Sequence, residues 1–383
     1  MILFLHNRYR TTGGEERVVD ELMALVRERL DEPAELLERD SAALGKLSAA
    51  TGLLRGGLAP REVAKAVRLS SARVVHAHNL SPLFGWRALA AAREEGARVI
   101  LHLHQYRLVC ATGVCFTGGQ ECTRCHGRNT LPGMVRNCRG SRAEALAYGA
   151  SLALWQQRLI EQADAFIVPS EFARERLREL GAPLDWERVH VLPPPVRFPE
   201  EIADAKSGSY ALVVSRLAPE KGVDVAVEAC QMAGVPLVLA GDGPERENLE
   251  AQAGHCDLHF LGHVADAELA NLRRGAALAI VPSRSAETFG MAAGEAMAAG
   301  VPVVASRIGA LPELVEQDGL VDPGDVTALA EAIARRWRDA AAAARGRARV
   351  QELCAPAAVA AGLAAVYGES SDRGANRATG RQP

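Results

Sequence analysis

The stretch YALVVSRLAPEKGVDVAVEACQMAGVPLVLAGDG, residues 210–243, sets the fold class of this chain. YALVV and PLVLA are short aliphatic runs, typical of strands that are buried on both faces. Residues 223–233 lie between them and have the pattern of a covering helix. A strand, a helix and a second strand in this order predict an α/β fold with a parallel sheet.

The same alternation extends in both directions along the 383-residue chain, through ARVVHAHN, ARVILHLH and AFIVPS before it and LAIVPS after it. Three prolines at 193–195 interrupt it, because proline continues neither a helix nor a central strand. We therefore expect two Rossmann-like doubly wound domains with a cleft between them. The expected boundaries are residues 1–192, a linker at 193–207, residues 208–355, a helix at 356–368 packing back toward the first domain, and a disordered tail at 369–383.

Composition excludes several classes of protein. Hydrophobic residues make up 48% and charged residues 24%, as in a globular protein with a large core. A net charge of -3 and only 4% aromatic residues argue against nucleic acid as a partner. The apolar N-terminus is too short for a secretory signal, and no run of eighteen apolar residues predicts a membrane span. We expect a cytoplasmic protein, with peripheral contact at the inner membrane face left open.

Two acids stand out in SAETFGMAAGEAMAAGVPVVAS, residues 285–306. Gly290 separates Glu287 from Glu295, so we expect Glu287 on a loop and Glu295 about one turn inside a helix that ends at Gly300. The free backbone N–H groups at such a helix start suit a diphosphate. Glu287 would then lie beside the group attached to the phosphate, and Glu295 could bind ribose hydroxyls. The alternative is that both acids are simply solvated.

A basic pair, Arg216 and Lys221, follows the strand at 210–214. In a doubly wound domain this loop opens on the same sheet edge as Glu287. Two cations facing a helix start would neutralise a diphosphate and stabilise it as a leaving group. The alternative is again a solvated surface pair.

Together these motifs resemble the retaining GT-B glycosyltransferases of family 4, the group 1 glycosyltransferases. Glu287 and Glu295 fit the family's E-x7-E pattern, and Arg216 and Lys221 fit its basic pair. TTGGEERVVDEL fits its glycine loop, and FLGHV fits the stretch that flanks the base. The resemblance covers residues 1 to about 365 and implies transfer of a sugar from a nucleotide-diphosphate sugar to an acceptor hydroxyl.

The resemblance also implies roles for single residues. The implied catalytic residues are Glu287, His104, Arg216 and Lys221. The implied donor-binding residues are Gly13, Gly14, Arg216, Lys221, Gly262, His263, Val264, Glu287, Phe289, Gly290, Met291 and Glu295. The implied mechanism retains the anomeric configuration and needs no catalytic metal, and no Asp-x-Asp motif occurs where one would be required. One departure is LPPPVRF at the hinge, where the family often has Asn-Gly.

Histidines are frequent on the strands of the first domain. His104 in LHLHQYR matches the family histidine that reaches the donor sugar. His102 precedes it on the same strand and points the same way. We interpret His102, His76 and His78 as structural.

Five of the eight cysteines crowd into residues 110–138. Cys110, Cys122, Cys125 and Cys138 could hold a structural zinc ion, with Cys115 as an alternative to Cys110. The segment resembles a cysteine-containing insert of one bacterial branch of the family. A metal-free thiol cluster is the alternative. Residues 122–126 also spell Cys-x-x-Cys-His, the string to which c-type haem is attached, but no export signal supports haem attachment.

The acceptor is less well specified by the sequence. Five arginines and no acids occur in residues 124–142, and two further arginines precede the glycine loop. These suggest an anionic acceptor, such as a polyprenyl-diphosphate-linked saccharide, another glycan or a phosphorylated small molecule, unless the loop is merely solvated. The candidate residues are Arg8, Arg10, Arg136 and Arg139. Alternative functions are a sugar-nucleotide epimerase of GT-B fold and a non-catalytic nucleotide-sugar-binding protein.

Overall fold

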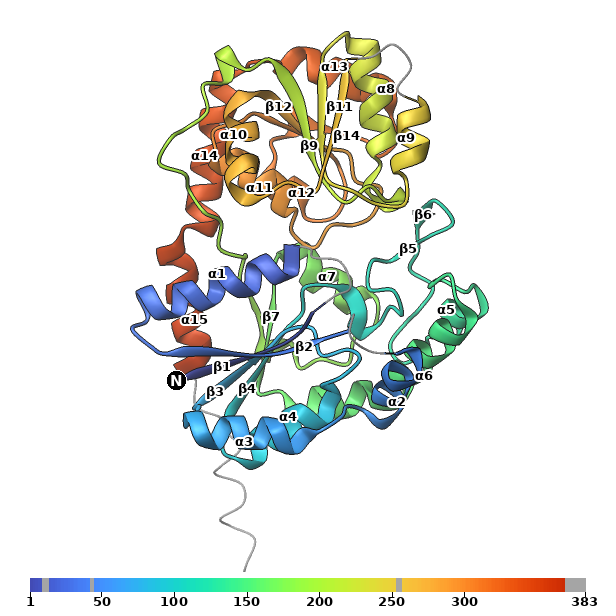
Figure 1. Cartoon of the computed structure of the whole chain (residues 1–383), viewed down its shortest axis with the longest axis vertical. Coiled ribbons are helices and arrows are strands. Elements are labelled where there is room, and N and C mark those ends of the chain that lie inside the picture. Colours follow the sequence, from blue (N-terminus) through green and yellow to red (C-terminus); the bar gives the residue numbers. More distant parts are fainter. Residues whose placement is uncertain (9–13, 42–44, 253–256, 369–383) are drawn as a thin grey trace, which may run out of the picture.

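The computed structural model describes residues 1–8, 14–41, 45–252 and 257–368 (Figure 1). Within this part of the chain lie two lobes, each built on a six-stranded sheet in which every strand pair is parallel. The predicted α/β class and GT-B arrangement are confirmed. Arg10, Gly13 and the tail at 369–383 lie outside the described residues.

The first sheet has the order β2-β1-β3-β4-β7-β8. Its strands are β1 Ile2–Arg8, β2 Ala34–Asp40, β3 Val74–Ala77, β4 Arg98–His102, β7 Ala165–Val168 and β8 Val189–Val191. The helices of this half are α1 Gly14–Arg29, α2 Lys46–Arg55, α3 Pro60–Ser70, α4 Gly85–Glu94, α5 Leu131–Val135, α6 Arg142–Gln162 and α7 Glu171–Glu179. A small hairpin, β5 Phe116–Thr117 with β6 Gln120–Glu121, lies in the cysteine insert.

The second sheet has the order β11-β10-β9-β12-β13-β14. Its strands are β9 Tyr210–Val214, β10 Leu237–Ala240, β11 Leu258–Gly262, β12 Ala276–Val281, β13 Val303–Ser306 and β14 Leu320–Val321. The helices of this half are α8 Val223–Ala233, α9 Arg246–Gln252, α10 Asp266–Gly275, α11 Met291–Ala298, α12 Leu311–Leu314, α13 Val326–Arg336 and α14 Ala340–Cys354.

Alternate side chains of β1 enter two different cores. Leu3 and Leu5 pack in the cluster that also holds residues of α3, α4 and α6. Ile2 and Phe4 point to the other face, where α1 covers the sheet. Because both faces are buried, the strand is a continuous apolar run and shows no alternation with polar residues.

The strand order positions the site. The first strand in sequence lies second in the first sheet (β1) and third in the second sheet (β9). In each sheet the chain winds outward from this strand first in one direction and later in the other. Loops therefore diverge between β1 and β3 and between β9 and β12, and ligands of such sheets bind at these switch points beyond the carboxyl ends of the strands. The loop after β9 carries Lys221 and the loop after β12 carries Glu287, so the second switch point brings these two side chains together.

The last helix, α15 Pro356–Gly368, belongs to the second half by sequence but packs on the first (Figure 1). Leu363, Val366 and Tyr367 are buried in one cluster with Ile2 and Phe4. Arg73 and Arg98 donate hydrogen bonds to the carbonyls of Tyr367 and Val366, at 3.2 and 3.1 Å.

One described segment, Ala340–Gly368, is long and apolar enough by composition to cross a membrane, contrary to the expectation from apolar run length. In the structure it is divided into α14 and α15 by a break before Pro356. Val350 and Cys354 of its first part lie in the core of the second domain, and α15 lies in the core of the first. The apolar composition is thus accounted for by two cores.

Candidate functional site

A carboxylate and an ammonium group form the centre of the site. Lys221 Nζ lies 2.7 Å from Glu287 Oε1, and Ser283 Oγ donates to the same oxygen at 2.7 Å. Burial acts to raise the pKa of Glu287, but the Lys221 charge and both hydrogen bonds outweigh it, so the pKa lies below its usual value. Glu287 is therefore an anion at neutral pH and Lys221 is held beside it.

The loop after Glu287 ends at the start of α11. Gly290 is the N-cap residue and has φ of 99°. A Cβ atom there would lie 2.6 Å from Leu311 Cδ2, so both backbone and space favour glycine. No described side chain caps this helix start, and uncapped N–H groups at a helix start suit an anionic ligand. As the spacing predicts, Glu287 lies on the loop and Glu295 lies inside the helix.

The first domain meets this loop directly. Thr288 Oγ1 donates to the carbonyl of His104 at 2.8 Å, and Ser170 Oγ donates to the carbonyl of Thr288 at 2.6 Å. On the other side of the loop, a Cβ on Gly14 would lie 3.8 Å from Met291 Cγ. His104, Gly14 and the start of α11 therefore border one junction between the domains.

Glu295, the candidate ribose ligand, is already ion-paired. Its Oε1 accepts from Arg17 of α1 at 2.8 Å, and its Oε2 accepts from Arg273 of α10. Arg17 also contacts Asp266 at 2.8 Å, so one side chain of the first domain bridges two acids of the second. A carboxylate offers about four lone-pair positions, and two of them are used here.

We predict that Arg17→Ala strengthens the binding of a nucleoside diphosphate two- to fivefold. Ribose hydroxyls would no longer compete with Arg17, and Arg273 would still orient Glu295; a partly exposed ion pair is worth about 0–1 kcal/mol. Isothermal titration with UDP, GDP and ADP measures the change. Weaker binding would mean that Arg17 belongs to the nucleotide site itself. Arg27→Ala, on the same helix, serves as the control.

The remaining donor candidates are spread more widely. Arg216 is half exposed and pairs with Glu220. Gly262 ends β11 with φ of 67°, and its carbonyl accepts from Gly241 N–H at 2.7 Å. Val264 is buried, whereas His263 is exposed. Phe289 is buried in the core of the second domain, so its side chain supports the loop and only its backbone can face a ligand.

A column of histidines runs through the first domain to the site. His78 Nδ1 is hydrogen-bonded to His104 Nε2 at 2.7 Å, and His76 Nε2 to His102 Nδ1 at 3.2 Å. The rings of His102 and His104 stack with centroids 4.0 Å apart. At the far end, His76 Nδ1 lies 2.7 Å from the hydroxyl of Tyr367 on α15.

Burial dominates the electrostatics of this column. It lowers the pKa of His76 and of His104 to about 3, and it lowers the pKa of His78 and His102 well below the usual value. All four rings are neutral at pH 7. His76, His78 and His102 have ligand atoms within 4.8 Å of one another, but two of the facing nitrogens are joined by the His76–His102 hydrogen bond.

The acceptor candidates do not gather at the junction. Arg8 lies 3.8 Å from Glu38 at the edge of the sheet. Arg139 donates to the carbonyl of Ala111 at 3.0 Å and lies over the ring of Tyr148, and Arg136 borders the cysteine cavity. Arg139 thus holds the insert against the domain.

The five cysteines of the insert line one cavity of about 20 Å³, which is room for a single small ion or water. These residues are Cys110, Cys115, Cys122, Cys125 and Cys138. A hydrogen bond from Cys115 lowers the pKa of Cys110 to about 5, and burial raises that of Cys125. Among the described residues, no three cysteine sulfurs lie within 4.8 Å of one another. Of the scattered cysteines, Cys230 and Cys354 are buried as expected and Cys256 is not described.

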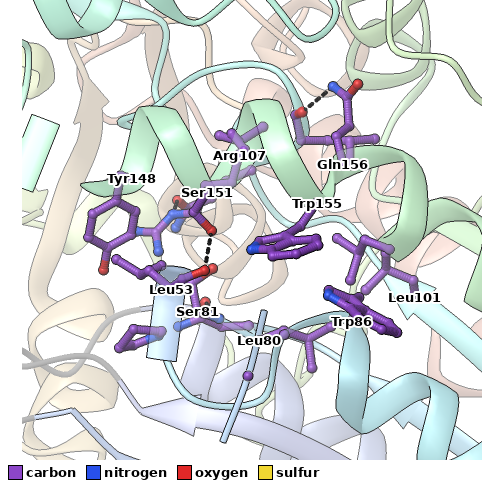
Figure 2. Close-up of a pocket in the computed structure, with 18 of the residues that line it drawn as sticks. Leu53, Leu80, Ser81, Trp86, Leu101, Arg107, Tyr148, Ser151, Trp155 and Gln156 are labelled. Atoms are coloured by element: carbon purple, nitrogen blue, oxygen red, sulfur yellow. Dashed lines mark hydrogen bonds between the residues drawn. The ribbon is translucent and has the colours of Figure 1, made fainter. Parts of the chain in front are cut away.

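A second cavity, of about 130 Å³, was not anticipated from the sequence. It begins at His104 and Glu15 and extends into the first domain, between α2, α4 and α6 (Figure 2). Trp86, Trp155 and Tyr148 contribute rings to its wall. Its lining comes from residues as far apart in the chain as Glu15 and Leu159, and no local motif marks them, which explains why sequence reasoning missed it.

The family described as "Glycosyl transferase 4-like domain" matches residues 10–195, and "Glycosyl transferases group 1" matches residues 197–351. The chain is 36% identical over 207 residues to a glycogen synthase of Mycobacterium tuberculosis, covering 50% of the chain and 49% of that protein. It is 32% identical over 266 residues to a D-inositol 3-phosphate glycosyltransferase of Mycobacterium sp. strain KMS, covering 62% and 58%.

Among solved structures, HepE of Anabaena in complex with UDP is similar with a TM-score of 0.62 and 20% identity. That similarity covers 95% of this chain and 98% of HepE, and at this identity it concerns the fold alone. The matches to the two mycobacterial enzymes span about half of their length.

Proposed function

Because this chain belongs to the group 1 glycosyltransferases, we propose that it transfers a sugar from a nucleotide-diphosphate sugar to an acceptor hydroxyl, with retention of the anomeric configuration. The observation that carries the proposal is the junction described above. There Lys221, Glu287 and the uncapped start of α11 lie at the switch point of the second domain, in contact with the His104 segment of the first.

In this proposal the diphosphate lies against the N–H groups of Phe289, Gly290 and Met291, where the helix dipole favours an anion. Lys221 and Arg216 supply positive charge to the bond that breaks. Arg216 is half exposed and paired with Glu220, so it has to exchange that partner for the phosphate. Fixed cations and the helix start provide the charge stabilisation, and catalysis then requires no metal ion.

The sugar would lie between Glu287 and His104. Glu287 is ionised and accepts hydrogen bonds from sugar hydroxyls, while it keeps Lys221 in place. His104 is neutral, so its ring can exchange a hydrogen bond with a sugar hydroxyl without adding charge. The bond from C1 to the phosphate oxygen breaks as the acceptor oxygen bonds to C1 on the same face. The acceptor proton goes to the departing phosphate oxygen.

We propose that the cysteine cavity binds a structural zinc ion through four thiolates, those of Cys110, Cys122, Cys125 and Cys138. The Cys115 thiol would keep its hydrogen bond to the Cys110 sulfur. The shared cavity and the soft thiolate donors support this. Zinc–sulfur bonds are about 2.3 Å long, so the ion would draw the sulfurs closer together than they lie here. Free thiols at all described cysteines are consistent with work in the cytoplasm.

Zinc content is directly measurable. We expect about one zinc per chain by atomic emission in protein purified without chelator, and a lower melting temperature after chelation. Cys125→Ser should lose the metal, whereas Cys230→Ser, in the core of the second domain, should retain it. Protein that contains no metal and does not respond to chelator would favour the metal-free thiol cluster.

The donor class can be found by thermal shift. We expect one of UDP, GDP, ADP or TDP, with its sugars, to raise the melting temperature of the wild type by several degrees, because a ligand that binds only the folded state stabilises it. Glu295→Ala should reduce that shift. If no nucleotide stabilises either protein, the assignment of this junction as a donor site fails.

A further inference from the structure

The cavity beside His104 lies on the acceptor side of the proposed reaction. Figure 2 shows the indole rings of Trp86 and Trp155 on one side of it, and Tyr148 with Arg107 on the other. The two indole centroids are 5.9 Å apart and the rings are inclined by 39°. Leucines complete the walls. The cavity is thus a ring-lined, largely apolar chamber that opens toward the junction.

Several polar side chains of the wall already have partners within the protein, whereas four buried atoms of the wall have none among the described residues: His78 Nε2, His102 Nε2, Trp86 Nε1 and Gln156 Oε1. Ser151 Oγ donates to the carbonyl of Leu53 at 3.0 Å, and Trp155 Nε1 donates to that of Leu54 at 3.1 Å. Gln156 Nε2 donates to the carbonyls of Leu108 and Gly127, at 2.7 and 3.0 Å. A ligand with one polar group could bond to one of these free atoms, whereas a ligand with many hydroxyl groups would bury some of them unpaired, which is unfavourable.

Glycines shape the lower wall of the chamber. A Cβ on Gly56 would lie 2.1 Å from Trp86 Nε1, and one on Gly57 would lie 1.8 Å from the carbonyl oxygen of Phe84. The loop after α2 therefore packs directly against the start of α4, and this holds the Trp86 ring in place. The chamber is built by close backbone contacts and is already formed in this structure.

The size of the chamber limits its occupant. Its volume is about 130 Å³, close to the engineered apolar cavity of about 150 Å³ that accommodates benzene. One six-membered ring fits. A polyprenyl chain or a disaccharide does not fit inside. Aromatic walls also favour an aromatic guest, because offset and edge-to-face ring pairs add about 0.5–1.5 kcal/mol beyond burial.

We propose that the acceptor carries an aromatic ring next to its reacting hydroxyl, and that this ring binds in the chamber between Trp86, Trp155 and Tyr148. This deepens the proposed function and rests on it. The hydroxyl end then faces the mouth, where Glu15 and His104 lie, and reaches the sugar bound at Glu287.

The test uses ligand-observed saturation-transfer NMR on the full chain without donor. The probes are 4-methylphenol, cyclohexylmethanol, methyl α-glucopyranoside and farnesyl diphosphate. We expect the strongest saturation for 4-methylphenol, at least threefold weaker binding of cyclohexylmethanol, and none for the glucoside. Preferred binding of the glucoside or of farnesyl diphosphate, or binding of no probe, would overturn the proposal.

A matched pair of variants on α6 locates the ligand. Leu152 lines the chamber, whereas Leu154 is half exposed on the same helix and does not line it. Leu152→Trp should fill the space and weaken 4-methylphenol binding at least tenfold, and Leu154→Trp should change it less than twofold. Equal effects of the two substitutions would show that the phenol binds elsewhere.

Nucleotide binding and phenol binding to the same protein test the donor site and the acceptor site separately. If UDP or another nucleotide stabilises the chain but no aromatic probe binds, the donor assignment stands and the acceptor inference fails. If 4-methylphenol binds in the chamber but no nucleotide is bound, the proposed transfer reaction fails. Transfer of a labelled sugar to 4-methylphenol, abolished by Leu152→Trp and kept by Leu154→Trp, would support both.

Discussion

Replacement of Glu287 by glutamine is expected to lower the turnover of sugar transfer by about 10²- to 10³-fold, the usual loss when one preorganised polar group is removed from a transition-state site. The amide keeps the shape of the side chain but removes the charge that holds Lys221 at 2.7 Å. Lys221 would then be free to move away from the diphosphate. The measurement is the rate of transfer, or of donor hydrolysis, with the donor found by thermal shift.

Two comparisons make this expectation specific. Binding of the free nucleotide should change less than about fivefold in Glu287→Gln, because the residue faces the sugar. Glu268→Ala, on the exposed side of α10, should leave turnover unchanged. A Glu287→Gln protein with full activity would remove Glu287 from the mechanism.

Acid sensitivity is the second large effect, and it follows from the histidine column. In the folded protein the pKa values of His76, His78, His102 and His104 lie far below the 6.5 of an unfolded chain, chiefly because the rings are buried. The unfolded chain therefore binds more protons between pH 6.5 and about 3. Stability is complete above about pH 6.5 and is lost as the pH falls through this window.

As the pH falls from 7.5 to 5.5, each such histidine lowers the free energy of unfolding by about 1.4 kcal/mol, and four together lower it by about 5 kcal/mol. This is a large part of a typical protein stability of about 5–15 kcal/mol. Paired carboxylates such as Glu287, with lowered pKa values, act only below about pH 4.5 and do not offset this. Glu16 near the column acts to raise the pKa of His104 and reduces the effect slightly.

Urea unfolding at pH 7.5 and 5.5, followed by tryptophan fluorescence, measures the loss. His102→Leu should reduce the difference in the free energy of unfolding between pH 7.5 and pH 5.5 by roughly one quarter, whatever the substitution does to stability at pH 7.5. His259→Gln removes an exposed ring outside the column and is the control for histidine replacement. Stability that is equal at the two pH values would mean that the column takes up protons without unfolding.

The sequence was most informative where structure is local. The helix predicted at 223–233 is α8, and the break at Gly290 separates Glu287 from Glu295 as its spacing requires. In both cases a strand, a glycine and an amphipathic or small-residue helix follow each other within about thirty residues. Periodicity and glycine chemistry are sufficient for such units.

Features made by distant segments could not be read in this way. The edge strand β2 Ala34–Asp40 is rich in acids, and only pairing with β1 makes it a strand. No sequence motif marks Arg17, yet it bridges Asp266 and Glu295, which lie 249 and 278 residues later in the chain. The aromatic chamber likewise depends on how α2, α4 and α6 pack, and no single one of these helices encodes it.

The return of α15 to the first domain has a mechanical consequence. The polypeptide passes between the lobes twice, once after Val191 and once at Ala355, and Val196 N–H bonds to the Cys354 carbonyl at 3.4 Å where the two passages meet. A single tether would permit twisting in any direction. Two adjacent connections instead define a hinge axis. Opening of the cleft about this axis is the motion that they restrain least, whereas twisting of one lobe against the other is restrained. Substrates would then enter, and products leave, on the side of the cleft opposite to these two connections.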